Sequence, residues 1–284
     1  MEPALLAEVL PGSALEPAPG PRACAITFLA TRDGERSVVR TSGASLPPKR
    51  DLAREAGALR ALDGKLAPRL LSSNPSFHVV EFVKGRTATA EEGVDALAEL
   101  HSTDWRALGF AEGGRNDGSI EKHLARATRS LDDSMRRGKQ VAGGKRKRKV
   151  RVLVEVGWWL RSRLPPLHDA VLCHGNALPG KVFTSSRGTT FIDWEHWTIG
   201  DPFVDLAWAL IGEDEALFER YALATGRALG EPTYYVVFSL WRRAIELEAL
   251  YVERLLGHDD PALDRLDDEV PALGARALAI ARPL

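Results

Sequence analysis

The sequence predicts an α+β fold in which strands dominate the first part of the chain and helices the last part. Runs rich in β-branched residues, bounded by turn residues, lie near the start. Longer stretches with helical periodicity occupy the end. With 284 residues, of which 44% are hydrophobic and 27% charged, the chain is long and apolar enough to bury a core of its own. A short peptide module and a disordered chain are therefore excluded.

The first predicted elements are two strands that form a hairpin. Residues 24–30 and 37–41 are β-rich, and Asp33 with Gly34 between them favours a tight turn because both residue types tolerate a positive φ angle. A third, apolar strand is expected at residues 77–83. The chain is thus expected to begin with an antiparallel sheet.

Residues 49–62 predict an amphipathic helix that carries an acid on its buried side. Leu52, Leu59 and Leu62 fall within about 80° of one another at 100° per residue. Glu55 lies between these leucines on the same wheel, so its carboxylate is aimed at the interior of the protein. Because a buried acid is costly without a cation, we expect Glu55 to have a cationic partner.

The remaining helices and strands follow in chain order. Three further helices are expected, at residues 93–101, 152–164 and 233–256. Three short strands are expected, at residues 171–173, 181–184 and 189–193. Another helix is expected to begin at Asp201, because Asp is a favoured N-cap and Pro202 suits the first helical position.

The net charge of −1 hides an uneven distribution of charge. A run of basic residues without any acid lies between Ser134 and Val154, so the rest of the chain is acidic. The densest part, Lys145 to Lys149, could hold an anionic partner such as nucleic acid or membrane headgroups. We favour the alternative of a solvated loop, because glycines precede the run and no aromatic residue is interleaved with it.

Composition also indicates the cellular location of the protein and the redox state of its cysteines. No stretch approaches the roughly 18 apolar residues that a membrane span needs. The first residues lack the pattern of a signal peptide, so a cytoplasmic location is expected. Cys24 and Cys173 are too few for a disulfide framework or a four-cysteine metal site, and both thiols are expected to be reduced.

Residues 173–181 run from a short strand into a loop shaped by glycine and proline, and such rigid loops present polar side chains. Asp193 follows at the end of the next hairpin, adjacent to that loop. This arrangement suits a site for a metal ion and a phosphate. The alternative is that Asp193 only caps a turn and that His174 packs in the core.

Several motifs in a fixed order are more specific than these single residues. The later ones are His174-Gly175-Asn176 with Lys181, Ile192-Asp193-Trp194-Glu195, and Gly200-Asp201-Pro202-Phe203-Val204-Asp205-Leu206-Ala207. The earlier ones are Val38-Val39-Arg40, Arg54-Glu55-Ala56 and Leu97-Ala98-Glu99-Leu100-His101. In this set of motifs the chain resembles the aminoglycoside phosphotransferase and choline kinase family, relatives of the protein kinases, over nearly its whole length.

The resemblance implies a bilobal, protein-kinase-like fold. It implies a β-rich N-lobe of residues 1–83 and a mainly helical C-lobe of residues 84–284. ATP or GTP would bind between these lobes, against the connecting segment that contains Glu81 and Val83.

The same resemblance assigns roles to single residues. Arg40 would pair with the phosphates of the nucleotide and with Glu55, which gives the inward carboxylate the cation that it needs. Asp193, with Glu195 close by, would hold Mg²⁺. Three further motif residues are expected to have structural roles: His174, Asp201 and Asp205.

Two positions depart from the family pattern. Asn176 stands where the family has its catalytic aspartate, and a neutral amide can orient a hydroxyl but cannot accept its proton at pH 7. Lys181 stands where the family has a metal-binding asparagine. Its ammonium is expected to repel one metal ion and to pair with Asp193 or with a nucleotide phosphate, which would reduce the dependence on Mg²⁺. The glycine-rich phosphate loop is not clear either, since the nearest candidates are Pro11-Gly12-Ser13 and Pro19-Gly20-Pro21.

Three hypotheses for the function remain open. The first is a phosphotransferase that acts on a small-molecule or peptide hydroxyl with weakened or lost activity. The second is a pseudokinase that binds a nucleotide, a peptide or a partner protein without phosphoryl transfer. The third is a binder of nucleic acid or another acidic surface through Lys145 to Lys149, which the acidic character of the rest of the chain disfavours. The sequence does not identify the acceptor.

Overall fold

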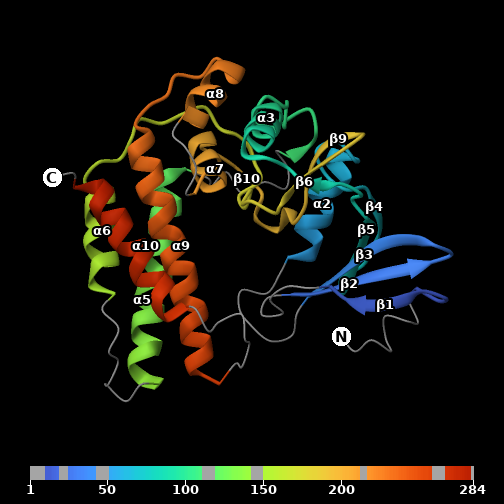
Figure 1. Cartoon of the computed structure of the whole chain (residues 1–284), viewed down its shortest axis with the longest axis horizontal. Coiled ribbons are helices and arrows are strands. Elements are labelled where there is room, and N and C mark those ends of the chain that lie inside the picture. The colour runs from blue at the N-terminus through green and yellow to red at the C-terminus, as the bar shows by residue number, and fades with distance from the viewer. Residues whose placement is uncertain are drawn as a thin grey trace. The chain divides into compact units, whose positions relative to one another are not determined.

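The computed structural model describes residues 10–18, 25–42, 51–110, 119–141, 150–211, 216–257 and 266–282. The predictions for Lys145 to Lys149 and for Pro19-Gly20-Pro21 lie outside these described residues. The chain forms two compact units (Figure 1). Unit 1 comprises Met1–Gly114 and His174–Trp197, and unit 2 comprises Arg115–Cys173 and Thr198–Leu284. The lobe boundary expected after residue 83 stays a prediction.

Unit 1 contains a five-stranded antiparallel sheet with the strand order β1-β2-β3-β5-β4. The strands are β1 Ala14–Pro17, β2 Ala25–Arg32, β3 Glu35–Ser42, β4 Leu70–Ser73 and β5 Phe77–Glu81. The predicted hairpin is confirmed, because β2 pairs with β3 and both Asp33 and Gly34 take positive φ angles, 51° and 79°. Strands β1 and β4 have no counterpart among the predicted elements, and β5 ends two residues before its predicted end.

The two faces of this sheet differ in character, because side chains alternate along each strand. One face forms a hydrophobic core from Phe28, Ala30, Val39, Phe77 and Val79. The other face carries Arg40 of β3 and His78 of β5, which lie opposite each other in the antiparallel register. Both side chains are buried, so the sheet holds a guanidinium and an imidazole inside unit 1.

Helix α2, Leu52–Leu62, carries the inward carboxylate that its periodicity predicts. The helix begins later than the predicted residue 49, because Asp51 caps it by accepting a hydrogen bond from the Arg54 backbone amide at 3.0 Å. Glu55 is 2% exposed and is buried together with the leucines of the helix. The pattern of the sequence therefore predicted the direction of this side chain correctly.

The remaining elements of unit 1 include the short strands and the 3-10 turn that flank Asp193. A small sheet has the order β6-β8-β9, with β6 Arg86–Thr87, β8 Val182–Ser185 and β9 Gly188–Phe191. Helix α3, Ala90–His101, begins with a capping box of Thr89 and Glu92. Strand β9 stops before the predicted residue 193, because Asp193 takes a left-handed conformation with φ 74° and ψ 58°. The 3-10 turn Trp194–His196 follows directly.

Unit 2 is mainly helical, with α5 Ile120–Val141, α6 Arg151–Arg161, α7 Pro202–Ala209, α8 Ala216–Thr225, α9 Pro232–Leu255 and α10 Leu266–Ala281. Helix α9 is central, since α5, α6, α7 and α10 all pack against it (Figure 1). Strands β7 Val171–Cys173 and β10 Thr198–Gly200 form an antiparallel pair. The two units together confirm the α+β class. Within the described ranges, no helix has both the length and the apolar character that crossing a bilayer requires.

The predicted helix start at Asp201 is confirmed. Asp201 Oδ1 accepts a hydrogen bond from the Phe203 backbone amide at 2.9 Å, and Pro202 occupies the first turn of α7. The hydroxyl of Tyr235 on α9 donates to the other carboxylate oxygen at 2.8 Å. Asp201 therefore joins the start of α7 to α9.

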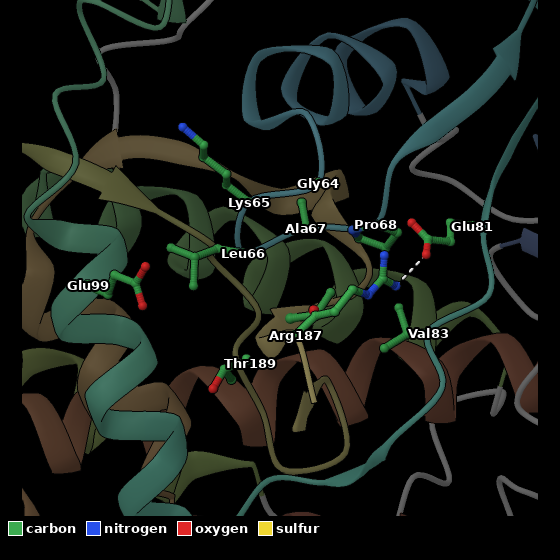
Figure 2. A pocket seen from close by; sticks show the side chains of 12 residues that line it. Gly64, Lys65, Leu66, Ala67, Pro68, Glu81, Val83, Glu99, Arg187 and Thr189 are labelled. Atoms are coloured by element: carbon green, nitrogen blue, oxygen red, sulfur yellow. Dashed lines mark hydrogen bonds and ion pairs between the residues drawn. The ribbon is translucent and has the colours of Figure 1, made fainter. Parts of the chain in front are cut away.

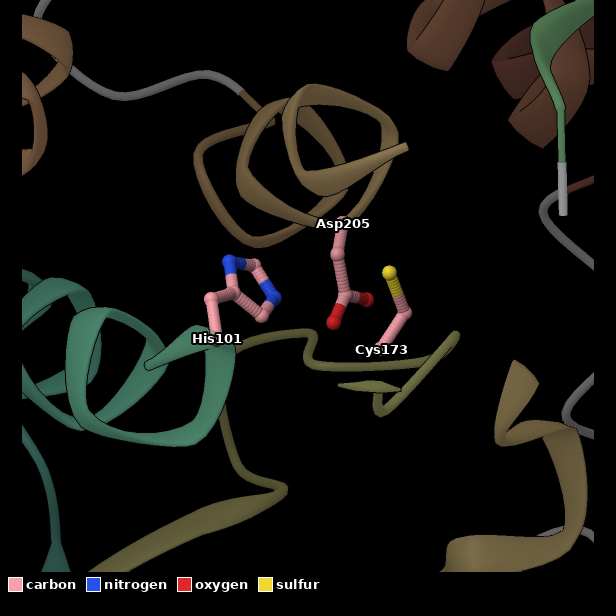
Figure 3. Close-up of side chains that lie close together, drawn as sticks. All are labelled: His101, Cys173 and Asp205. Carbon is pink, nitrogen blue, oxygen red and sulfur yellow. The ribbon is translucent and has the colours of Figure 1, made fainter. Parts of the chain in front are cut away.

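Asp205 of α7 extends toward Cys173 at the end of β7 (Figure 3). Burial raises the pKa of the Cys173 thiol well above its ordinary value, and the carboxylates of Asp205 and Asp201 raise it further. The thiol is therefore protonated at neutral pH, and its sulfur lies 3.6 Å from the carbonyl oxygen of Asp201. The structural role expected of Asp205 stays a prediction.

Candidate functional site

Arg40 and Glu55 form the ion pair that the inward carboxylate of α2 predicts. Arg40 Nη1 lies 3.3 Å from Glu55 Oε1, and the two side chains are 10% and 2% exposed. The pair joins strand β3 to helix α2 inside unit 1. A buried pair of this kind stabilises its surroundings only while both partners are present, because removal of one leaves an uncompensated charge.

Asp193 continues this pair into a longer chain of charges. Its Oδ1 accepts a hydrogen bond from Arg40 Nη2, and its Oδ2 accepts one from Lys181 Nζ. Of the two partners expected for Lys181, a carboxylate and a phosphate, the structure contains the carboxylate. The four side chains are hereafter called the ion chain: Glu55, Arg40, Asp193 and Lys181.

Backbone contacts bring Lys181 next to Asp193 although the β8–β9 hairpin separates them. The Ile192 amide donates to the Lys181 carbonyl oxygen at 2.9 Å, so the residues just before β8 and just after β9 are paired. The Lys181 amide in turn donates to the Leu178 carbonyl oxygen at 2.9 Å, which closes a turn in the preceding loop. Both side chains therefore leave the same end of the hairpin.

The ion chain shifts the pKa values of its acids in opposite directions. Burial raises the pKa of Glu55 to about 7, although the charge of Arg40 opposes the shift. Burial also disfavours the charged form of Asp193, but Arg40 and Lys181 outweigh it and hold the pKa of that carboxyl well below its usual range. Asp193 is therefore ionised at neutral pH, whereas Glu55 is close to its titration midpoint.

His78 is a site residue that sequence reasoning missed. Its Nε2 lies 3.6 Å from Glu55 Oε2, on the side opposite the Arg40 contact, and its side chain is fully buried. Burial, followed by the charge of Arg40, lowers the pKa of His78 to about 4. The imidazole is neutral at pH 7. The signal that could have found it is an imidazole between the apolar residues Phe77 and Val79 of the expected strand.

The loop before Lys181 is held by backbone contacts around His174. His174 Nε2 lies 3.0 Å from the Ile192 carbonyl oxygen, and the backbone amide of Asn176 donates to His174 Nδ1 at 3.3 Å. The His174 ring therefore carries its proton on Nε2. The ring also packs against Phe191 and Trp194, as the alternative interpretation expected. A side chain at Gly175, where φ is +78°, would overlap the His196 carbonyl oxygen.

The donor set at Asp193 does not fit Mg²⁺ in this arrangement. Magnesium binds oxygen ligands with strict geometry, and both oxygens of Asp193 already accept charged hydrogen bonds. The second expected ligand is Glu195, and its Oε1 atom lies 3.2 Å from His196 Nε2. A metal ion at Asp193 would lie close to the positive charges of Lys181 and Arg40. The metal-binding roles of Asp193 and Glu195 therefore stay predictions.

A cavity of about 250 Å³ lies elsewhere in unit 1 (Figure 2). It is lined by residues 64–68, Glu81, Val83, Glu99 and residues 187–190. Glu81 pairs there with Arg187, and with Arg69 at 3.3 Å; these contacts outweigh the effect of burial and lower its pKa. Among the described residues, no member of the ion chain lines the cavity. The side chains of Glu81 and Val83, both expected at the nucleotide, thus face a separate space.

Comparison with known proteins gives a family match. Residues 25–247 match the model of the Phosphotransferase enzyme family. Two curated relatives align with 64% of the chain: Acyl-CoA dehydrogenase family member 11 of Gallus gallus at 28% identity, and Probable acyl-CoA dehydrogenase IBR3 of Arabidopsis thaliana at 26%. The matched parts are 26% and 27% of those proteins, so the chain spans about a quarter of the length of the curated relatives it matches.

Solved structures share the fold over nearly the whole chain. A candidate aminoglycoside phosphotransferase of Ralstonia eutropha has a TM-score of 0.71 at 19% identity, with 95% of this chain and 90% of that one covered. Choline kinase LicA of Streptococcus pneumoniae has a TM-score of 0.66 at 14% identity, with 98% of each chain covered. Spectinomycin phosphotransferase APH(9)-Ia, solved with ADP and its antibiotic, has a TM-score of 0.58 at 14% identity, with 99% and 98% covered. These likenesses confirm the protein-kinase-like fold.

Proposed function

Since the chain belongs to the phosphotransferase enzyme family, with its aminoglycoside phosphotransferases and choline kinases, we propose that it binds a nucleoside triphosphate at the ion chain and transfers phosphate weakly or not at all. The observation that carries this proposal is the pairing of Asp193 with Arg40 and Lys181 at both of its oxygens. The carboxylate that would hold a metal ion is already neutralised by residues of the protein itself.

The nucleotide is ATP or GTP, held by its phosphates. Lys181 has three N–H donors and is 33% exposed, so it can keep its contact with Asp193 and still donate to a phosphate oxygen. Arg40 is more deeply buried and serves mainly to hold Asp193 and Glu55. The ADP in the spectinomycin phosphotransferase structure supports a nucleotide as the ligand of this fold. Roles for Glu81 and Val83 at the nucleotide remain part of the proposal.

The chemistry expected of the site is slow. The Asn176 amide can orient an acceptor hydroxyl but cannot take its proton, and loss of a general base costs about 10²–10⁴ in rate. Phosphoryl transfer depends mainly on positioning and charge, so this loss alone leaves some activity. The second loss is the metal-binding asparagine, which is Lys181 here. The acceptor is a small-molecule or peptide hydroxyl whose identity we leave open.

The alternative is a pseudokinase that binds a nucleotide, a peptide or a partner protein and never transfers phosphate. Asn176 and the paired state of Asp193 both favour it. Consumption of ATP by the unmodified protein would exclude this alternative, because a pseudokinase does not turn over. Binding of an anionic partner at Lys145 to Lys149 and a cytoplasmic location stay predictions.

A thermal-shift titration with ATP, with and without Mg²⁺, tests the proposed function. Ligand that binds only the folded state raises the melting temperature as its concentration passes Kd. We expect a shift with ATP alone and little further shift with Mg²⁺, because Lys181 already supplies a positive charge at Asp193. No shift under either condition would overturn nucleotide binding. A shift that requires Mg²⁺ would overturn the assignment of Lys181.

A further inference from the structure

Arg54 of α2 and Trp197 of the segment after Asp193 hold each other through three contacts. The Arg54 guanidinium donates through Nη2 to the Trp197 carbonyl oxygen. Its Cζ atom lies 4.6 Å from the centroid of the Trp197 ring, a cation–π distance. Trp197 Nε1 donates to the Arg54 carbonyl oxygen at 3.2 Å. These two residues, the Arg54–Trp197 pair, are therefore joined by side chain and backbone in both directions.

The Arg54–Trp197 pair closes a ring with the ion chain. One half of the ring runs from Glu55 through Arg40 to Asp193. The other half runs from Asp193 along the 3-10 turn to Trp197, and through Arg54 back to α2, where Arg54 directly precedes Glu55. Helix α2 is thus attached to the segment of Asp193 at two places.

Trp197, which provides this second attachment, is buried and packed against another aromatic ring. It is 3% exposed, and its ring meets that of Phe110 edge-on with centroids 4.8 Å apart. Bulky aromatic rings buried in this way have few alternative positions. The Arg54 side chain therefore lies against a buried ring that also packs against a residue outside α2.

The ion chain needs such a second attachment to keep Glu55 in place. Arg40 also donates to Asp193, so the contact with Glu55, at 3.3 Å, is one of two carboxylate contacts that it makes. If α2 moved outward, Arg40 would keep Asp193 as a partner, so the ion chain alone resists this movement weakly. The Arg54–Trp197 pair resists it directly, because it holds the residue next to Glu55.

We propose that Arg54 and Trp197 are positioning residues that keep Glu55 against Arg40 and so hold the nucleotide site assembled before any ligand arrives. The proposal rests on the proposed binding of a nucleotide at the ion chain. Neither residue touches the phosphates in this account. Both act through the position of α2.

Two measurements on the full chain test the proposal. The first is amide hydrogen exchange of residues 52–62 in the unliganded protein. The second is the ATP affinity from titration. The variants are Arg54→Met, Arg54→Lys, Trp197→Phe and Glu55→Gln. The matched control is Arg60→Met, because Arg60 is an exposed residue of the same helix and its side chain donates to the Ser73 hydroxyl.

We expect Arg54→Met to speed exchange in α2 and to weaken ATP binding about tenfold, whereas Arg60→Met changes neither. Arg54→Lys keeps a cation that can donate to the Trp197 carbonyl oxygen and should restore part of the affinity. In the Glu55→Gln background, Arg54→Met should weaken ATP binding no further, because it acts only through Glu55. A merely structural role would weaken binding equally in both backgrounds.

The outcomes separate this inference from the proposed function. If the unmodified protein binds ATP and Arg54→Met leaves both exchange and affinity unchanged, the inference is overturned and the proposed function stands. If the unmodified protein binds no ATP, the proposed function fails. The positioning role of Arg54 is then tested only by the hydrogen-exchange rates of α2. If Arg54→Met does not fold, Trp197→Phe gives the same test, because it weakens the ring contact and removes the indole donor but keeps an aromatic ring.

Discussion

The ammonium of Lys181 donates to Oδ2 of Asp193, and the Arg40 guanidinium occupies Oδ1 of the same carboxylate. A site that uses a metal ion to bridge a carboxylate and a phosphate needs those oxygens. Under the proposed function, the Lys181 side chain supplies the positive charge that a metal ion would supply. The dependence of nucleotide binding on Mg²⁺ is therefore the property in which this chain should differ most from the family pattern.

Replacement of Lys181 by Asn should increase the dependence of ATP affinity on Mg²⁺. The change frees Oδ2 of Asp193 and adds an amide oxygen that can ligate the metal. We expect weaker ATP binding without Mg²⁺ and a gain of about tenfold when Mg²⁺ is added, measured by titration calorimetry. Lys139→Asn, at an exposed position of α5, is the matched control and should change neither value. Equal Mg²⁺ dependence in Lys181→Asn and the unmodified protein would contradict the role of Lys181.

The double change Asn176→Asp with Lys181→Asn should restore phosphoryl transfer. It supplies a carboxylate that can accept a proton and an amide that can ligate a metal. The two positions lie five residues apart on one loop, so their effects should be coupled, with each single change doing little. ATP consumption is measured against amino sugars, amino alcohols and Ser/Thr peptides.

In the same assay the unmodified protein should consume almost no ATP. Robust turnover by the unmodified protein that Asp193→Ala abolishes would show that Asn176 is no barrier to the reaction. It would also remove the pseudokinase hypothesis.

Local patterns in the sequence predicted those parts of the site that depend on a single element. Leucine spacing in α2 placed Glu55 inward, and residue types placed the N-cap at Asp201. Patterns of this kind work because a helix repeats its faces at a fixed angle. The partner of Glu55 then followed from the cost of burying an acid and from the family motif that contains Arg40.

The parts that the sequence did not reveal depend on contacts between distant elements. His78 lies in a run of buried residues, where the alternation that shows which side chain faces α2 is hidden. Arg54 and Trp197 are 143 residues apart, and neither residue type is unusual at its position. The side chain of Glu81 turns to Arg187 because the β8–β9 turn approaches β5 in space, which no local pattern encodes.

Arg40→Met should destabilise the protein strongly. The substitution keeps much of the side-chain volume but leaves Glu55 buried without its cation. Removal of one partner from a buried ion pair costs about 3–5 kcal/mol of unfolding free energy, measured by urea denaturation. Arg32→Met is the control, because Arg32 pairs with Asp33 at the surface and such a pair is worth less than about 1 kcal/mol. Equal losses in the two variants would show that the ion chain does not contribute to stability.

The pH dependence of stability should reveal His78 and Glu55 as opposing groups. The pKa of His78 falls from its ordinary 6.5 to about 4, so its contribution to stability is complete above 6.5 and is lost as the pH falls toward 4. The pKa of Glu55 rises from its ordinary 4.5 to about 7, so its contribution is complete below 4.5 and is lost as the pH rises toward 7. Between pH 4.5 and 6.5 the two effects largely cancel.

His78→Asn removes one of these two opposing effects. We expect the unfolding free energy of this variant to fall more steeply with rising pH between 4.5 and 6.5 than that of the unmodified protein, as urea titrations at several pH values would show. Glu55→Gln should do the reverse, with stability that rises over the same range. Parallel pH profiles for the three proteins would contradict the opposite pKa shifts of His78 and Glu55.

Alanine at Gly175 should cost more stability than alanine at Gly180, although both glycines lie in the same loop with similar backbone angles, φ +78° and φ +87°. A side chain at either position carries the cost of a left-handed conformation, about 1–2 kcal/mol. Only at Gly175 would the new Cβ overlap backbone, the His196 carbonyl oxygen, whereas nothing lies within 4 Å of it at Gly180. We therefore expect Gly175→Ala to lower the free energy of unfolding by about 1–3 kcal/mol more than Gly180→Ala does, as measured by urea denaturation. Gly175→Ala should also weaken ATP binding, because a shift of the loop away from His196 moves Asn176. Equal losses of stability in the two variants would show that the loop does not pack closely against the turn that follows Asp193.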